Sequence, residues 1–143
     1  MGKILCATRG GEASYRTQDK AIALAKERGD TLLFLYVADL HFLDKTAASI
    51  VVDVAREIEH MGEFLLAMAQ ERARKQGIES SYLLRQGDVR EEIKTAAVEE
   101  GATMVVLGQA AGDEPECAFP PATLVKFAEE IEAETGIEAR VVC

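Results

Sequence analysis

A short apolar run followed by small residues, TMVVLGQAAG at positions 103–112, is the part of this sequence best suited to hold a ligand. Its first five residues, 103–107, are apolar or β-branched, which is typical of a strand buried on both faces of a parallel sheet. The run ends at Gly108 in a loop of small residues. Because ligands bind just beyond the carboxyl ends of parallel strands, we expect any small-molecule site to lie at this loop.

The charge of the chain restricts the partners that it can have. The 143 residues include 16 Lys and Arg against 25 Asp and Glu, which gives a formal net charge of −9. An acidic surface argues against nucleic acid and anionic membranes as partners. A polyanionic ligand would therefore depend on backbone N–H groups or on a nearby arginine.

The cysteines and the N-terminal segment indicate the cellular compartment of the protein. The chain has three cysteines, Cys6, Cys117 and Cys143, an odd number that excludes a complete set of intrachain disulfides and fits a reducing cytosol. The N-terminal segment enters a strand at once and shows no signal-peptide pattern. No apolar run is long enough to span a bilayer. We therefore expect a cytoplasmic protein, with Cys6 in its core.

Hydrophobic patterning predicts five strands that alternate with four helices. The strands are predicted at 3–8, 31–37, 80–86, 103–107 and 137–143, and the helices at 15–28, 46–76, 89–100 and 122–135. Strict alternation of this kind implies a single α/β domain over residues 1–143, with a five-stranded parallel sheet and helices on both faces. The third strand is more polar than the others and is expected near an edge of the sheet.

Local signals support these boundaries. Ser14 and Asp88 are predicted to cap the helices that follow them. The longest predicted helix carries a regular apolar stripe with spacings of four, three, four and three, which predicts the face that packs on the sheet. The stripe comprises Val54, Ile58, Met61, Leu65 and Met68. Gly62 lies inside this helix and indicates either a close packing contact or a bend.

Four segments, in this order and at this spacing, resemble the universal stress protein family over essentially the whole chain. They are ILCATRGGEAS at 4–14, LLFLYV at 32–37, QGDVREEI at 86–93 and MVVLG at 104–108. The resemblance implies a Rossmann-like sandwich of the adenine nucleotide alpha hydrolase-like type and a homodimer formed through the last strand. It also implies one of two functions, because some members bind ATP or AMP and others act as stress-responsive dimers without nucleotide.

The phosphate motif of the nucleotide-binding members is only partly matched here. In the family, strand four is followed by a glycine, two residues, a second glycine and, further on, a glycine before Ser or Thr, so that backbone amides can approach phosphate. Gly108 matches the first glycine, but Ala111 stands at the second and Gly112 comes one position late. Ala122 and Thr123 stand at the final pair.

Other departures from the family pattern lie in the same region. Pro120 and Pro121 remove two backbone donors where phosphate would dock. Glu114 and Glu116 add negative charge to the loop. Arg9 replaces the Asp that helps to hold nucleotide in the family, although its guanidinium could itself meet a phosphate.

Two functional hypotheses follow from these observations. The first is a non-catalytic stress-response homodimer with a degenerate nucleotide pocket, since the sequence shows neither a nucleophile–base pair nor a metal-ligand spacing between His41 and His60. The second is an ATP- or AMP-binding module, with or without Mg²⁺, that has at most slow ATPase activity. Its site would comprise Thr8, Arg9, Gly10 and Val37 around the base and ribose, and Gly108, Ala111, Gly112, Ala122 and Thr123 near the phosphates.

Overall fold

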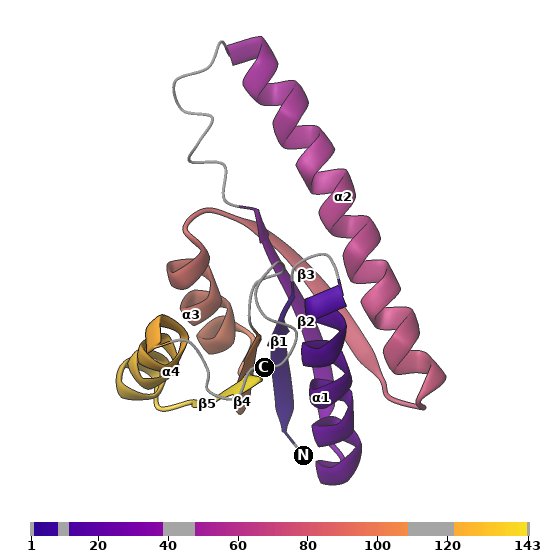
Figure 1. Cartoon of the computed structure of the whole chain (residues 1–143), viewed down its shortest axis with the longest axis vertical. Coiled ribbons are helices and arrows are strands. Elements are labelled where there is room, and N and C mark those ends of the chain that lie inside the picture. The colour runs from indigo at the N-terminus through magenta and orange to yellow at the C-terminus, as the bar shows by residue number, and fades with distance from the viewer. Residues whose placement is uncertain (1, 9–11, 39–47, 109–121, 143) are drawn as a thin grey trace.

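Five parallel strands form one sheet, with helices in the connections between them (Figure 1). The computed structural model describes residues 2–8, 12–38, 48–108 and 122–142. The strands are β1 (Lys3–Ala7), β2 (Thr31–Ala38), β3 (Ser80–Gln86), β4 (Met104–Gly108) and β5 (Glu138–Val142). The helices are α1 (Glu12–Arg28), α2 (Ala48–Lys75), α3 (Val89–Glu99) and α4 (Ala122–Thr135). The predicted α/β class and its single parallel sheet are confirmed.

The strand order is β3-β2-β1-β4-β5, so the first strand of the chain lies in the middle of the sheet. β3 and β5 form the two edges, which confirms the prediction that the more polar third strand lies near an edge. β1, β2 and β4 are buried almost throughout, which explains their continuous apolar sequences.

One predicted helix cap is confirmed and the other is wrong. Asp88 has an extended backbone, and its side chain accepts a hydrogen bond of 3.1 Å from the backbone N–H of Glu91 at the start of α3. α1 begins at Glu12, so Ser14 lies inside the first turn instead of preceding it. An N-cap needs a non-helical backbone, which a residue inside the helix does not have.

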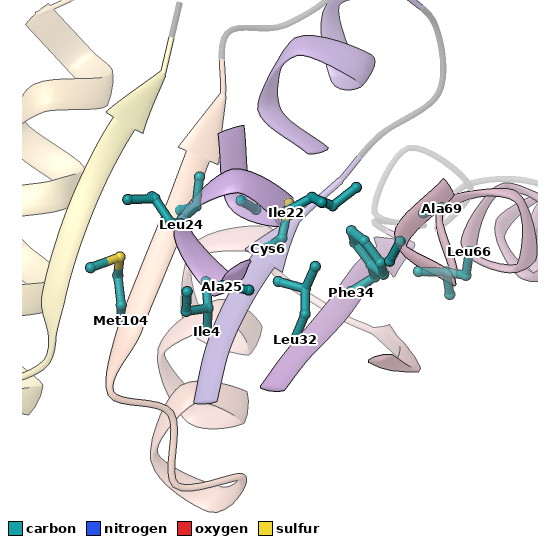
Figure 2. Close-up of a cluster of buried hydrophobic side chains, with 13 residues drawn as sticks. Ile4, Cys6, Ile22, Leu24, Ala25, Leu32, Phe34, Leu66, Ala69 and Met104 are labelled. Atoms are coloured by element: carbon teal, nitrogen blue, oxygen red, sulfur yellow. The ribbon is translucent and has the colours of Figure 1, made fainter. Parts of the chain in front are cut away.

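Two hydrophobic clusters fill the two sides of the sheet. On one side, α1 and α2 cover alternate residues of the central strands, including Ile4, Cys6 and Phe34 (Figure 2). On the other side, α3 and α4 cover the intervening residues, such as Leu5 and Val105. The period of two along each strand therefore assigns every central side chain to one pair of helices.

The packing face of α2 differs from the predicted one. Leu66, Ala69 and Ala73 are fully buried against the sheet, whereas Met61 and Met68, predicted to be core residues, are exposed. Small residues on either side of Leu66 let the helix approach the sheet closely. The other two stripe residues whose burial is described are half-buried, so the predicted stripe lies beside the face that packs and only partly overlaps it.

Gly62 lies on the face of α2 that packs on the sheet. A Cβ atom at this position would lie 2.7 Å from Cδ1 of Tyr36 and 2.9 Å from Cδ1 of Leu84. Real Cβ atoms do not approach other heavy atoms so closely, so this position requires glycine. Of the two alternatives that the sequence left open, the close packing contact is therefore confirmed.

Candidate functional site

The carboxyl edge of the sheet is where the sequence predicts a ligand site. Of the predicted site residues, Thr8, Val37 and Gly108 are described in full. Ala122 and Thr123 are the first two residues of α4, and only their backbone is described. Arg9, Gly10, Ala111 and Gly112 lie outside the described residues.

Thr8 and Gly108 come together at the ends of neighbouring strands. β1 and β4 pair with Ile4 opposite Met104 and Cys6 opposite Val106, so the same register brings Thr8 level with Gly108. Thr8 is almost fully buried, and its backbone N–H donates a hydrogen bond of 2.8 Å to the carbonyl oxygen of Leu35 on β2. Thr8 is therefore held between the two strands that flank β1.

Val37 lies on the other side of the sheet from these two residues. Its side chain packs against the cluster that α3 and α4 cover. Thr8 and Gly108, in contrast, both contact residues of α1. The structure thus brings two of the three described residues into one cluster and leaves the third across the sheet.

Two buried polar residues of α1, Thr17 and Gln18, complete the cluster at the ends of β1 and β4. Nε2 of Gln18 donates a hydrogen bond of 2.8 Å to Oγ1 of Thr8. The Oε1 atom of Gln18 is buried and has no hydrogen-bond partner among the described residues. A buried acceptor without a partner is costly, so its presence calls for an explanation.

The side chain of Thr17 occupies the space beside Gly108. A Cβ atom on Gly108 would lie 1.8 Å from Oγ1 and 2.8 Å from the Cβ of Thr17. Packing between α1 and β4 is therefore enough to require a glycine at the end of β4. The match of Gly108 to the first glycine of a phosphate motif thus has a structural explanation.

Sequence reasoning missed Thr17 and Gln18, although a signal for them was present. Each lies four residues before a buried residue of the apolar face of α1, Ala21 and Ile22 respectively. Residues four apart share one face of a helix. Thr17 and Gln18 therefore extend the buried face of α1 by one turn, and this spacing is the signal that would have identified them.

The surroundings of two ionisable groups on the described strands, Arg85 and Cys6, account for their protonation states. Arg85, just before the end of β3, binds Glu99 and Glu92, and these hydrogen bonds raise the pKa of its guanidinium. Burial raises the pKa of the Cys6 thiol to about 12, so the thiol stays protonated at neutral pH. Among the described residues, no cluster of His, Cys, Asp or Glu is arranged to hold a metal ion.

No helix among the described residues has the length and hydropathy needed to cross a bilayer. His60 lies on α2 and is exposed, whereas His41 falls outside the described residues. Neither Cys117 nor Cys143 is described. These positions add nothing to the cluster formed by Thr8, Thr17, Gln18 and Gly108, which is called the α1 polar cluster below.

The fold and this cluster define a parallel α/β protein of the Rossmann-like type whose first helix packs against the carboxyl ends of β1 and β4. A family model described as "Universal stress protein family" matches residues 1–114. The match covers most of the chain, so the protein belongs to the universal stress protein family. The resemblance noted in the sequence is therefore confirmed.

Individual relatives agree with this assignment. The chain is 26% identical over 116 residues to the universal stress protein YxiE of Bacillus subtilis, covering 76% of this chain and 78% of the relative. It is similar to the crystal structure of a universal stress protein family member from Burkholderia pseudomallei, with 26% identity, a TM-score of 0.72 and coverage of 99% and 95%. A family member from Arabidopsis thaliana, solved with AMP bound, shares 12% identity with a TM-score of 0.69 and coverage of 99% and 91%.

Proposed function

We propose that this chain is a cytoplasmic, non-catalytic regulatory protein of the stress response that works as a homodimer and has a degenerate nucleotide pocket. The proposal treats residues 1–143 as one universal stress protein domain. The observation that carries it is the contact between Thr17 and Gly108. Because helix packing alone requires a glycine at position 108, the presence of Gly108 is no evidence for a phosphate-binding loop.

The sequence of the loop after β4 supports the loss of phosphate binding. Ala111 stands where a glycine is needed for close approach of phosphate, and Pro120 and Pro121 lack the backbone N–H groups that would bind it. Glu114 and Glu116 add repulsion toward an anion. Every one of these differences acts against phosphate binding.

The proposed dimer forms through β5. Among the described strands, β5 pairs only with β4, so its other edge is open for a second copy. Two-fold antiparallel pairing centred on Ala139 would set Glu138 opposite Arg140 of the second copy, a favourable cross-strand pair. Light scattering of the purified chain at micromolar concentration tests this proposal, and a monodisperse monomer would exclude it.

A second candidate function is binding of an adenine nucleotide, with or without Mg²⁺. The unpartnered Oε1 atom of Gln18 favours it, because a buried acceptor beside Thr8 could receive a hydrogen bond from a ligand. The AMP-bound relative from Arabidopsis thaliana shares the fold, although its low identity carries no information about the site. Arg9 would then supply a positive charge to the phosphates, which the net charge of −9 otherwise disfavours.

Isothermal titration with ATP and with AMP, each with and without Mg²⁺, separates the two candidates. Absence of heat at millimolar nucleotide is the result expected for a degenerate pocket. Saturable binding would overturn that part of the proposal, and Arg9→Ala should then weaken affinity roughly tenfold or more if its guanidinium contacts phosphate. Circular dichroism of the variant provides the control for folding.

A further inference from the structure

The outer face of α2 carries large apolar side chains that take no part in the core. Met61 is 55% exposed and Phe64 is 65% exposed, and Met68 on the same face is also exposed. Leu66 and Ala69, which pack on the sheet, belong to a different face of the same helix. In Figure 1, α2 runs along one side of the molecule with β2 and β3 on its inner side.

The outer residues follow a heptad-like spacing. Positions 57, 61, 64, 68, 71 and 75 are separated by four, three, four, three and four residues, the spacing of a seam along which two helices pack. The outer seam, as this row is called below, consists of Glu57, Met61, Phe64, Met68, Glu71 and Lys75. Three consecutive members, Met61, Phe64 and Met68, are apolar and exposed, and such a group marks an interaction surface better than an isolated residue does.

The charges at the two ends of the outer seam indicate its partner. Glu57 stands at the N-terminal end and Lys75 at the C-terminal end, with three apolar residues and Glu71 between them. A second α2 running antiparallel about a two-fold axis near residue 66 would bring Glu57 of each copy beside Lys75 of the other. The same register sets Phe64 against Met68 and Met61 against Glu71, whereas parallel pairing would set Glu57 against Glu57 and Lys75 against Lys75.

The flanking charges of the helix have the same asymmetry. Segment 56–63 contains Arg56 with three glutamates, and segment 71–75 contains Glu71 with three basic residues. Each helix therefore offers one acidic and one basic half, which makes an antiparallel, isologous contact between identical chains electrostatically self-complementary. We propose that the outer seam binds the same seam of a second copy of this chain.

This contact is separate from the one proposed for β5. β3, on which α2 packs, and β5 are opposite edges of the sheet, so one copy can use both surfaces at once. If both contacts form, each copy joins two others, and loss of the outer seam reduces this larger assembly to a dimer. If the β5 contact does not form, the same loss reduces a dimer to a monomer, so the two proposals fail in distinguishable ways.

Sedimentation equilibrium of the full chain and of Phe64→Glu tests the proposal. The substitution places a charge in the apolar centre of the contact and should weaken one association step by about tenfold or more. Val98→Glu is the matched control, because Val98 is an equally exposed apolar residue (59%) on α3, away from the outer seam. It should leave the assembly unchanged, and both variants should keep the melting temperature of the parent at concentrations where the chain does not associate.

Charge reversal tests the antiparallel orientation. Glu57→Lys and Lys75→Glu should each weaken association about two- to fivefold, and the double variant should recover it. Failure of the double variant to recover association would overturn the proposed register. An unchanged assembly in Phe64→Glu would overturn the contact itself. A lower melting temperature without any dissociation would also overturn it, because the outer face of α2 would then be covered by the same chain.

Discussion

α1 and α2 cover the same side of the sheet but make their contacts in different ways. α1 has one apolar face, on which Ala21, Ile22 and Ala25 are buried. α2 has two faces with apolar residues, one of Leu66 and small residues that packs on the sheet, and the outer seam, whose apolar residues are exposed. The comparison teaches that side-chain size and burial need not coincide on a helix, because a close approach to a sheet selects small residues.

The two faces of α2 should differ most clearly in their effect on stability. Leu66→Ala removes a fully buried side chain and should lower the free energy of unfolding by about 2–5 kcal/mol. Phe64→Ala removes a larger but exposed side chain and should change it by less than about 0.5 kcal/mol at concentrations where the chain does not associate. Urea unfolding measures both, and equal losses would show that the assigned packing face is wrong.

The close contact of α1 with β4 can be tested at Gly108. Gly108→Ala forces a methyl group against Thr17 and should cost about 1–3 kcal/mol of stability. Adding Thr17→Ala removes Oγ1 but leaves a Cβ atom 2.8 Å away, so it should restore part of the loss. A double-mutant cycle by thermal unfolding measures this coupling, and independent effects of the two changes would contradict the contact.

Cys6, in the cluster under α1 and α2, should make stability depend on pH in alkaline solution. Burial raises the pKa of its thiol from 9.0 to about 12. Above pH 9 the unfolded chain loses this proton while the folded chain keeps it, so stability should fall by about 1.4 kcal/mol per pH unit until about pH 12. Urea unfolding on both sides of pH 9 measures the slope, which should be smaller in Cys6→Ala.

The smallest expected effect concerns the surface contact between the two helices. Arg72 of α2 stacks over the ring of Tyr15 at 4.6 Å and pairs with Asp19 of α1. Arg72→Ala should lower stability by about 0.5–1 kcal/mol, because the contact is partly exposed. Arg74 is the matched control, since its ion pair with Glu71 stays within α2. Equal changes in melting temperature for the two variants would show that Arg72 does not join the helices.

Much of this fold could be predicted from the sequence, because each element had a simple signal. The apolar run at 103–107 indicated a central strand, and β4 begins and ends within one residue of it. Asp88 was recognised as a cap because its type and position suit that role. The first turn of α1 was placed late, since capping residues indicate a helix start only approximately.

The candidate site was harder to predict for two physical reasons. Thr17 and Gln18 are polar residue types, which are mostly exposed, so their burial could be inferred only from their spacing of four to the buried Ala21 and Ile22. The face of α2 was misassigned because hydrophobic periodicity favours large residues over alanine and glycine. Ala111 and Gly112, two of the five residues predicted near the phosphates, lie in the loop at 109–121 outside the described residues, so their contacts stay predictions.

The central position of β1 has a consequence for synthesis of the chain. β1 emerges first, yet its partner β4 follows about a hundred residues later, as the hydrogen bond from the Thr103 N–H to the Lys3 carbonyl illustrates. At about 5–20 residues per second, a ribosome needs roughly 5–20 s to supply β4. During that time one edge of β1 stays unpaired, and an open apolar edge is a template for aggregation. A nascent chain stalled before β4 should therefore depend on chaperones much more than the finished protein does.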